Sequence, residues 1–246
     1  MLTEREKRIF SRQIMLPDIG EEGQEAIRKA RVLVVGAGGL GCPVLQYLNA
    51  AGIGSIGIVE FDMVNESNIH RQILYGGNDL GKLKSIIARD ILNKLSNLTQ
   101  TEVYNIRLTE ANAGKIISPW DIVVDATDNY ETRYVIDNVC SETGKPMIHG
   151  AIYGSEGQVS VFNYRGSGSY RSYNPKEQGR IRNPDPSQTG LFGMLPGVTG
   201  AMMAFEVIKI VTGTGEVLAD KILTFNILTH RYLLTRLSRK KNDQNK

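Results

Sequence analysis

The chain has 246 residues, of which 41% are apolar and 22% charged, as in soluble globular proteins long enough to bury a sizeable core. Its net charge of +3 comes partly from the basic run 239–241, so we do not expect a surface dedicated to DNA or other nucleic acid. The charged N-terminus, the strand-length apolar runs such as 56–59 and the two cysteines indicate a cytoplasmic protein without signal peptide, membrane span or disulfide framework.

Short apolar runs alternate with helical patterns over residues 31–150. Before them, residues 4–30 have a helical pattern that Gly20 and Gly23 are expected to break into two pieces. Strands are predicted at 31–35, 55–60, 102–107, 121–125 and 146–149, with helices at 40–51, 82–97 and 131–142. Because strands that alternate with helices build parallel sheets, we predict an α/β fold with a Rossmann-like, doubly wound sheet and helices on both faces.

The second half of the chain has a different pattern. Residues 159–162 alternate as in an antiparallel strand, whereas 165–190 are rich in Gly, Ser, Pro, Asn and Arg and predict a flexible loop with a functional role. The elements expected after this loop are an apolar helix at 197–212, a strand at 221–227, a strand or short helix at 230–237 and a disordered tail at 239–246. We therefore expect a single domain over 1–246, whose mainly parallel sheet continues into an antiparallel C-terminal part.

A glycine-rich turn separates the first predicted strand from the helix that follows it. Gly36, Gly38 and Gly41 have the GxGxxG spacing, in which glycines allow a tight turn and let backbone N–H groups approach phosphate at a helix N-terminus. Glu60 and Asp62 end the second strand, about 20 residues further on, where one acidic side chain is expected to bind the ribose hydroxyls. This pattern predicts an adenine-nucleotide site and leaves NAD and ATP as alternatives.

Charged residues after the second strand favour ATP. Arg71 and Lys84 follow a polar loop, and fixed cations stabilise the charge that develops when a triphosphate loses pyrophosphate, which hydride transfer does not require. Asp128 lies in Asp125-Ala126-Thr127-Asp128-Asn129, at the end of a predicted strand, where it is placed to hold Mg²⁺. For Asp125, at the strand end itself, capping or packing is the alternative role.

Five short motifs in this order resemble those of the HesA/MoeB/ThiF family, the bacterial relatives of ubiquitin-activating enzymes: GAGGLG, EFD, SNIHRQ, GKLK and DATDN. The SRQI segment at 11–14 and the helix start at 196–200 are also similar to the family, and the resemblance covers residues 8–228. It implies ATP-dependent adenylation of the C-terminal glycine of a ubiquitin-like sulfur-carrier protein of the ThiS or MoaD type, with release of pyrophosphate. The pathway would be thiamine or molybdopterin biosynthesis.

The resemblance also implies a division of the chain and its partners. Residues 31–150 would form a nucleotide-binding half, and residues 151–238 a carrier-binding half, after the helical segment 1–30. The expected partners are a carrier ending in Gly-Gly, a separate sulfur donor protein and a second copy of the chain in a homodimer.

Roles for individual residues follow from the matched motifs. The loop of Gly36, Gly38, Gly39 and Gly41 would hold the nucleotide, with Gly38 and Gly41 at its phosphates. Asp62 is assigned to the ribose, with Glu60, which stands where the family often has Asp, as the other acidic residue there. Asn68, Arg71 and Gln72 are assigned to the triphosphate, and Lys84 to the α-phosphate. Asp128, beside Asn129, is assigned to Mg²⁺, and Arg12 to the γ-phosphate in the partner subunit.

The chain also departs from the family pattern. Where relatives often have the first CxxC pair of a zinc site it reads Ser169-Tyr170-Arg171-Ser172, so no zinc is expected. Pro186 stands where many relatives have a loop cysteine, and Cys42 and Cys140 are interpreted as packing residues. We therefore predict adenylation without a covalent thioester.

The proposed chemistry requires no general base. A C-terminal carboxylate, with a pKa of about 3.5, is already ionised at neutral pH. Its reaction with an α-phosphate instead requires cations that bring two anions together. His149 is accordingly interpreted as a packing residue. Three alternatives remain: a relative that adenylates a peptide or modifies tRNA, an NAD-dependent oxidoreductase, and a non-catalytic binding module.

Overall fold

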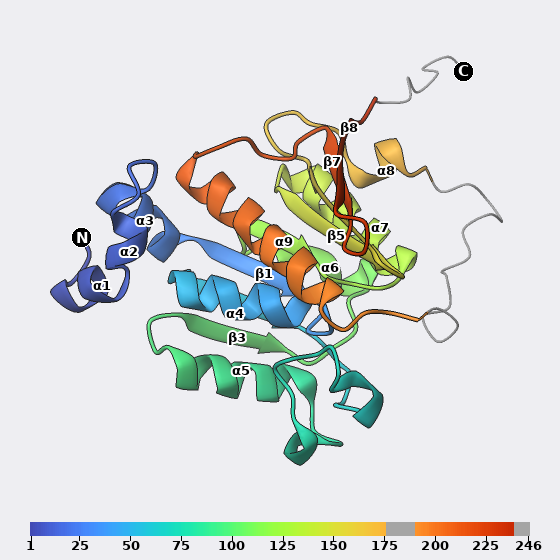
Figure 1. Cartoon of the computed structure of the whole chain (residues 1–246), viewed down its shortest axis with the longest axis horizontal. Helices are drawn as coiled ribbons and strands as arrows, with labels where there is room; N and C mark the ends of the chain where they lie inside the picture. Colours follow the sequence, from blue (N-terminus) through green and yellow to red (C-terminus); the bar gives the residue numbers. More distant parts are fainter. Residues whose placement is uncertain (176–189, 239–246) are drawn as a thin grey trace.

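The computed structural model describes residues 1–175 and 190–238, so Pro186, most of the predicted loop 165–190 and the predicted tail 239–246 lie outside the described residues. Within this part of the chain, an eight-stranded sheet has the order β3-β2-β1-β4-β5-β6-β7-β8. The strands that pair in parallel are β1 (Arg31–Val35), β2 (Ser55–Val59), β3 (Gln100–Tyr104), β4 (Ile122–Asp125) and β5 (Met147–Tyr153). Those added in antiparallel fashion are β6 (Glu156–Phe162), β7 (Lys221–Asn226) and β8 (Arg231–Arg236). The predicted α/β class, with an antiparallel C-terminal part, is confirmed (Figure 1).

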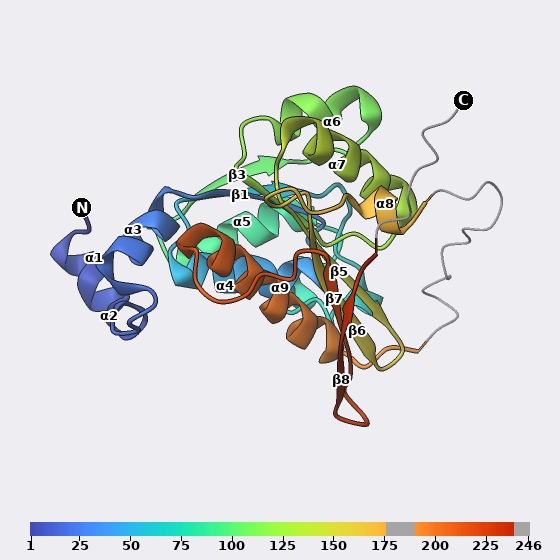
Figure 2. The same cartoon turned by 90° about the horizontal axis from the view of Figure 1, so that it is seen from above.

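Helices cover both faces of this sheet, because its central strands are apolar on both sides. In β1, Val32 and Val34 belong to one buried cluster, together with residues of α4 (Gly41–Ala51), α5 (Lys84–Leu95) and α9 (Leu195–Thr212). The alternate residues Leu33 and Val35 belong to a second cluster with α6 (Glu110–Ile117) and α7 (Tyr130–Thr143). Figure 2 shows the sheet between these two helical layers. The continuous apolar run of β1 is thus explained by burial of both of its faces.

The register of the parallel strands brings their carboxyl ends to one edge. Val35 of β1 pairs with Val59 of β2 and with Asp125 of β4, and Asp125 pairs with His149 of β5. The strand order reverses at β1, with β2 on one side and β4 on the other. Open α/β sheets bind ligands at such a switch point, outside the carboxyl ends of the strands. This edge is therefore the place to look for a site.

The N-terminal segment forms α1 (Glu4–Ile9), α2 (Ser11–Ile14) and α3 (Gly20–Lys29) at one end of the molecule. The predicted break at Gly20 and Gly23 is wrong, because Gly20 begins α3 and Gly23 lies inside it. The breaks fall at Phe10 and at residues 15–19 instead. A glycine suits position 23 inside the helix because a Cβ atom there would lie only 3.0 Å from Ile19 Cγ2.

Several other elements differ from the sequence-based expectation. Helix α6 was not expected, because its short sequence contains a glycine and an asparagine; its signal is the capping box formed by Thr109 and Asn112. Strand β3 ends at Tyr104, short of the predicted 107, because its partner β2 ends at Val59. The last element is a strand, β8, and the expected loop begins with a short helix, α8 (Tyr170–Tyr173). Two 3₁₀ turns, η1 (Glu66–Asn68) and η2 (Gly77–Asp79), follow β2.

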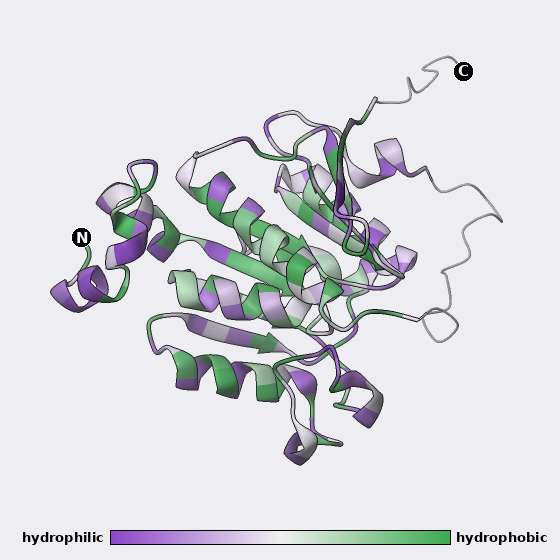
Figure 3. Ribbon diagram, in the orientation of Figure 1, coloured by the Kyte–Doolittle hydropathy of each residue, from purple (hydrophilic) through white to green (hydrophobic). Residues whose placement is uncertain are grey.

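Helix α9 is the long apolar helix of the structure. The expectation that apolar stretches are strand-sized is wrong for Leu195–Thr212, which is long and apolar enough to cross a membrane by length and composition. Half of this helix is buried, however, and it contacts α4, β5 and β6. Figure 3 shows apolar residues predominating along it and along β1. Its composition is therefore explained by its place in the core of the fold.

Candidate active site

The glycine turn after β1 leaves no room for side chains at two of its positions. Gly36 has φ +95°, and a Cβ atom there would lie 2.7 Å from the Ala126 carbonyl oxygen. A Cβ atom at Gly41, the first residue of α4, would lie 2.0 Å from the Gly36 carbonyl oxygen. Only glycine allows this close approach of two backbone segments. The turn is thereby closed tightly against the end of β4, with the N-terminus of α4 beside it.

The buried side chain of Glu60 fixes the shape of this turn through backbone N–H groups. Its carboxylate is buried and accepts three backbone N–H groups: Ala37 at 2.9 Å through Oε2, and Phe61 at 2.8 Å and Asp62 at 2.9 Å through Oε1. With both oxygens used in this way, Glu60 ties the glycine turn to the end of β2. Its role as a ribose ligand stays a prediction, and the geometry favours Asp62 for that role.

Tyr75 and Cys42 hold the next peptide of the turn, between Ala37 and Gly38. The Tyr75 hydroxyl donates to the Ala37 carbonyl at 2.7 Å, and the Cys42 thiol lies 3.4 Å from that oxygen. Burial raises the pKa of both groups, that of Cys42 to about 12, so both stay protonated donors at neutral pH. Ala37 is thus held through its N–H by Glu60 and through its carbonyl by Tyr75. The packing role expected for Cys42 agrees with this position.

Lys84 and Asp62 face each other at the end of β2. The Lys84 side chain is only 6% exposed, and its Nζ lies 3.4 Å from Asp62 Oδ2, whereas the Asp62 side chain is 53% exposed. The backbone N–H of Lys84, the first residue of α5, also donates to the Asp62 carbonyl at 3.0 Å. A largely buried ammonium group needs anionic partners. Lys84 is therefore a cation held at the edge of the sheet, and Asp62 offers an exposed carboxylate beside it.

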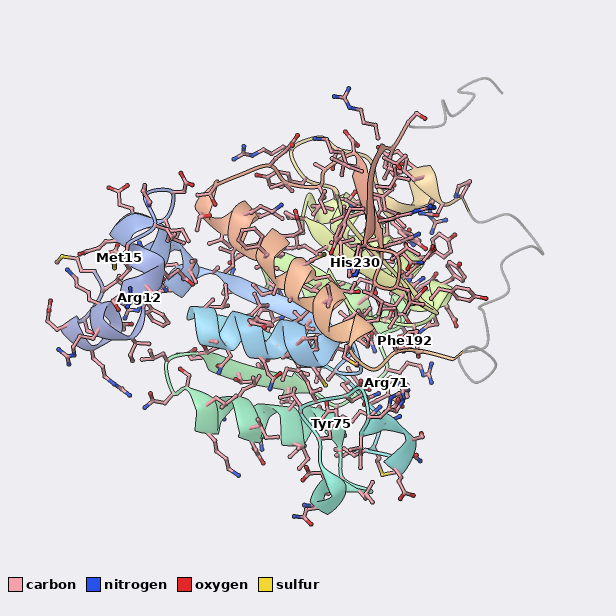
Figure 4. All side chains as sticks on the ribbon, in the orientation of Figure 1. Arg12, Met15, Arg71, Tyr75, Phe192 and His230 are labelled. Atoms are coloured by element: carbon pink, nitrogen blue, oxygen red, sulfur yellow. The ribbon has the colours of Figure 1, made fainter. Side chains whose placement is uncertain are left out.

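The polar loop after β2 brings Arg71 and Gln72 to the glycine turn and also carries Asn68. Arg71 lies against it, since a Cβ atom at Gly39 would lie 3.9 Å from Arg71 Cγ, and its guanidinium donates to the Ser67 carbonyl at 2.7 Å. Gln72 is buried, and its Oε1 has no hydrogen-bond partner among the described residues. Asn68 is partly occupied in capping η1, where its Oδ1 accepts the Asn65 N–H at 3.3 Å. Figure 4 shows Arg71 at this end of the molecule, near Phe192, which precedes α9.

The turn between β4 and α7 completes this edge. Asp125 is fully buried; its Oδ1 accepts from the Thr127 N–H at 3.1 Å and from the Thr127 hydroxyl at 2.6 Å. Its Oδ2 lies 2.6 Å from Nδ1 of the buried His149. Asp128 is exposed, and Asn129 caps α7 by accepting the Thr132 N–H at 2.9 Å. The alternative role of Asp125, in fixing the turn, is the one the structure shows.

The Asp125–His149 contact joins a carboxylate to a neutral ring. Burial alone would raise the pKa of Asp125, but His149, Arg133 and Thr127 outweigh that effect and lower it. Burial also lowers the pKa of His149, despite the neighbouring carboxylate. Because an ionised carboxylate can only accept, the His149 Nδ1 carries the hydrogen of this bond. His149 also packs against Phe162 and Tyr170. It is the packing residue that the sequence indicated.

Arg12 is not brought to this site within one chain. It lies on α2, is exposed, and stands at the opposite end of the molecule from Arg71 (Figure 4). The sequence-based role of Arg12 is in the partner subunit's site, and that role stays a prediction.

The site offers cations and one suitably placed carboxylate rather than a preformed metal cage. Over residues 1–175 and 190–238, no group of three or more His, Cys, Asp and Glu side chains is arranged to hold a metal ion. The exposed carboxylate of Asp128 fits Mg²⁺ that arrives with a nucleotide, since Mg²⁺ typically takes one or two carboxylates together with phosphate oxygens. Gln72 Oε1, which has no partner in the part of the chain that the structure describes, is a further polar atom that a bound ligand could satisfy.

Comparison with known proteins identifies the family. The ThiF family model matches residues 10–246. The sulfur carrier protein adenylyltransferase of Thermus thermophilus is 45% identical over 231 residues, which cover 92% of this chain and 85% of that protein. The chain belongs to the ThiF family. Its named relatives are adenylyltransferases, and this ThiF family chain is a nucleotidyltransferase.

Other ThiF relatives are longer than this chain. The adenylyltransferase and sulfurtransferase MOCS3 of Xenopus laevis is 41% identical over 241 residues, which cover 95% of this chain and 52% of that protein. The probable adenylyltransferase/sulfurtransferase MoeZ of Mycobacterium tuberculosis is 39% identical over 235 residues, 94% of this chain and 60% of that protein. This chain therefore spans about half to three fifths of these two proteins.

Solved structures confirm the fold of the ThiF chain. Escherichia coli MccB, crystallised with MccA-N7isoASN, has a TM-score of 0.83 and 18% identity over 95% of this chain and 72% of that one. A crystal structure of PaaA has a TM-score of 0.82 and 20% identity over 96% of this chain and 75% of that one. At this identity, the likeness concerns the fold.

Two groups at the site were not found by sequence reasoning. Tyr75 reaches the glycine turn from a loop with no regular pattern, so only its position in the fold reveals its contact with Ala37. Arg133 lies on α7, and its Nη2 donates to the Thr127 carbonyl at 2.9 Å. Its signal in the sequence is its position in the first turn of the helix that follows DATDN, close to the end of the preceding strand.

Proposed function

We propose that this ThiF family chain uses ATP to adenylate the C-terminal glycine carboxylate of a ubiquitin-like sulfur-carrier protein that ends in Gly-Gly. A carboxylate oxygen of the carrier attacks the α-phosphorus of ATP, the bond to the bridging oxygen breaks, and pyrophosphate leaves. The products are carrier acyl-adenylate and pyrophosphate. The named relatives that are sulfur carrier adenylyltransferases support this choice of substrate.

The buried Lys84, beside Asp62 at the end of β2, is the observation that carries the proposal. Two anions, the carboxylate and the α-phosphate, must meet in this reaction, and a cation held with little exposure stabilises them strongly because water screens it poorly. Arg71 supplies a second cation at the turn, placed for the leaving pyrophosphate. The α4 N-terminus adds backbone N–H groups directed at the phosphates. A base is not needed, because the carboxylate is already ionised.

The remaining parts of the site have roles that follow from their positions. Asp62 binds the ribose with its exposed carboxylate, and Asp128 holds Mg²⁺ beside Asn129. When bound, Mg²⁺ neutralises phosphate charge. Arg12 completes the site of a second copy of the chain in a homodimer.

The acyl-adenylate is passed on without a thioester to this chain. Cys42 and Cys140 are fully buried, and burial raises the pKa of both thiols. The nucleophilic form is the thiolate, which neither site favours. Sulfur is therefore delivered by a separate donor protein. The proposed setting is cytoplasmic, without zinc, and in thiamine or molybdopterin biosynthesis.

A peptide is the second candidate substrate within the same chemistry. Structures of the MccB fold have been solved with MccA, but at 18–19% identity they bear on the fold alone. An NAD-dependent oxidoreductase would have no use for Lys84 and Arg71 beside the turn.

ATP–pyrophosphate exchange separates these candidates. Exchange should require a carrier with a free C-terminal Gly-Gly and should be absent with the same carrier amidated at its C-terminus. If exchange depends on a peptide or on tRNA instead, that molecule is the substrate in place of the carrier. If none of these molecules supports exchange, the alternative of a non-catalytic binding module is favoured.

Substitution of the two cations tests the mechanism in the same assay. Arg71→Ala and Lys84→Ala should each reduce exchange by a factor of at least a few hundred, the scale of one lost electrostatic contact to the transition state. Near-normal exchange in either variant would remove that residue from the mechanism.

A further inference from the structure

The peptide bonds on both sides of Thr127 are fixed by buried side chains. The Thr127 N–H and hydroxyl donate to Asp125, and its carbonyl accepts from Arg133 Nη2 at 2.9 Å. Asn129, on the other side of Asp128, is fixed by its cap on α7. In the described part of the chain, the exposed Asp128 side chain itself makes no hydrogen bond or ion pair. The direction of its carboxylate therefore depends on how its neighbours are held.

Arg133, which holds this turn, is a charged side chain with little exposure to solvent. Its side chain is 11% exposed, and its Nε lies 3.8 Å from Asp125 Oδ2 without a hydrogen-bond partner among the described residues. Its guanidinium also lies 5.3 Å from the centre of the Tyr130 ring. A buried guanidinium needs a counter-charge. Asp125 provides it, because the neighbouring His149 is neutral.

The placement on α7 explains why one arginine can reach the turn. Asn129 precedes the helix, and Arg133 follows it by four residues, about one helical turn, so Arg133 lies close enough to the start of α7 for its Nη2 to reach the Thr127 carbonyl. Arg133 donates a hydrogen bond to the peptide between Thr127 and Asp128, and the capping residue Asn129 follows Asp128 in the chain. The carboxylate of Asp128 is thus carried on a short segment anchored at both ends.

We propose that Arg133 is a positioning residue for adenylation, which fixes the Thr127 peptide so that the Asp128 carboxylate is directed to the nucleotide-bound metal. This inference deepens the proposed function and rests on it for the role of Asp128. Arg133 acts through Asp128 and does not touch the nucleotide.

Metal binding is the readout that a merely structural role would not change. The probe is Mn²⁺, measured by electron paramagnetic resonance on the full chain saturated with a non-hydrolysable ATP analogue. Arg133→Gln should weaken Mn²⁺ binding about tenfold to a hundredfold, the range for residues that orient a metal ligand. Arg133→Lys should recover part of this loss, because an ammonium group can still donate to the Thr127 carbonyl.

A matched control is Arg31→Gln, which breaks the exposed Arg31–Asp121 ion pair at the opposite end of the strands. It should leave Mn²⁺ affinity at the wild-type value. A lower melting temperature of Arg133→Gln with unchanged Mn²⁺ affinity would overturn the proposal, because it would make Arg133 a stabilising residue only.

A double-mutant cycle with Asp128→Asn tests whether the two residues act together. If Arg133 acts through Asp128, Arg133→Gln should change Mn²⁺ affinity by less than about twofold once Asp128 is replaced. The same loss in both backgrounds would overturn the proposal, as would wild-type chain that binds no Mn²⁺ with the analogue. If Arg133→Gln does not fold, Arg133→Lys serves in the cycle.

The cycle requires neither a carrier nor turnover. A failure of carrier-dependent exchange would therefore refute the proposed substrate and leave the link between Arg133 and Asp128 to be judged by the metal data alone.

Discussion

Glu60→Gln is the substitution that most directly tests how the glycine turn is held. The Glu60 carboxylate accepts from the N–H groups of Ala37, Phe61 and Asp62 at 2.8–2.9 Å, in a buried position. A glutamine has one acceptor oxygen. If that oxygen stays on Phe61 and Asp62, the new amide group faces the Ala37 N–H, donor against donor.

The cost of this change can be estimated from its parts. A hydrogen bond to a charged group contributes about 1.5–3 kcal/mol, and a buried N–H left without a partner costs about 1–3 kcal/mol. Allowing for some rearrangement, we expect the free energy of unfolding to fall by about 3 kcal/mol. For a chain of this length that corresponds to a melting temperature lower by about 6–12 °C. The displaced turn should also bind an ATP analogue more weakly.

Glu66→Gln provides the matched control, because it makes the same chemical change on an exposed side chain of η1. Its melting temperature should stay within about 2 °C of the wild type, as for most exposed substitutions. Differential scanning calorimetry and titration with the analogue measure both effects. If Glu60→Gln is as stable as the wild type, the three N–H contacts do not hold the turn. Glu60 would then again be a candidate ligand of the ribose.

Three further substitutions test neighbouring features. Tyr75→Phe removes the hydroxyl that donates to the Ala37 carbonyl at 2.7 Å and should lower stability by about 1 kcal/mol in denaturant unfolding; no change would mean that this bond is not made in solution. Burial lowers the pKa of His149, so as pH falls below about 6.5 its imidazole takes up a proton in the unfolded chain before it does so in the folded chain. The wild type should therefore lose stability more steeply than His149→Gln between pH 6.5 and 5.5, by up to about 1.4 kcal/mol per pH unit, whereas parallel pH profiles would contradict a buried neutral ring. Finally, Cys42 and Cys140 should react with a thiol reagent only on unfolding, and replacement of both by Ala should preserve ATP–pyrophosphate exchange; labelling of the native chain, or lost exchange in a folded variant, would assign a cysteine to the reaction.

Much of the fold could be predicted because the strongest sequence signals were local and agreed with one another. The run 31–35, the glycine turn and the helix after it combine burial on both faces, a steric need for glycine and helical periodicity. The N-terminal breaks could not be predicted from Gly20 and Gly23, because contacts with Ile19 and α9 decide whether a glycine ends a helix.

The candidate site was predicted at the level of which residues gather there, and less well in how they are held. Lys84, Arg71 and Asp128 were expected near the turn from their motifs; the structure has Lys84 beside Asp62 after β2, Arg71 against Gly39 and Asp128 in the turn after β4. The burial of Lys84 and the contacts of Arg133 depend on packing between elements distant in the sequence. No local pattern encodes such contacts, so these features had to come from the structure.

Transfer of label from ATP to the carrier is the most direct measurement of the central claim. ATP labelled at the α-phosphate should yield carrier that carries the label at its C-terminal glycine, and ATP labelled at the γ-phosphate should release the label as pyrophosphate. Lys84→Ala should reduce the transfer by a factor of at least a few hundred while the carrier still binds. Label on the carrier from the γ-phosphate, or none from either position with an intact Gly-Gly carrier, would contradict the account.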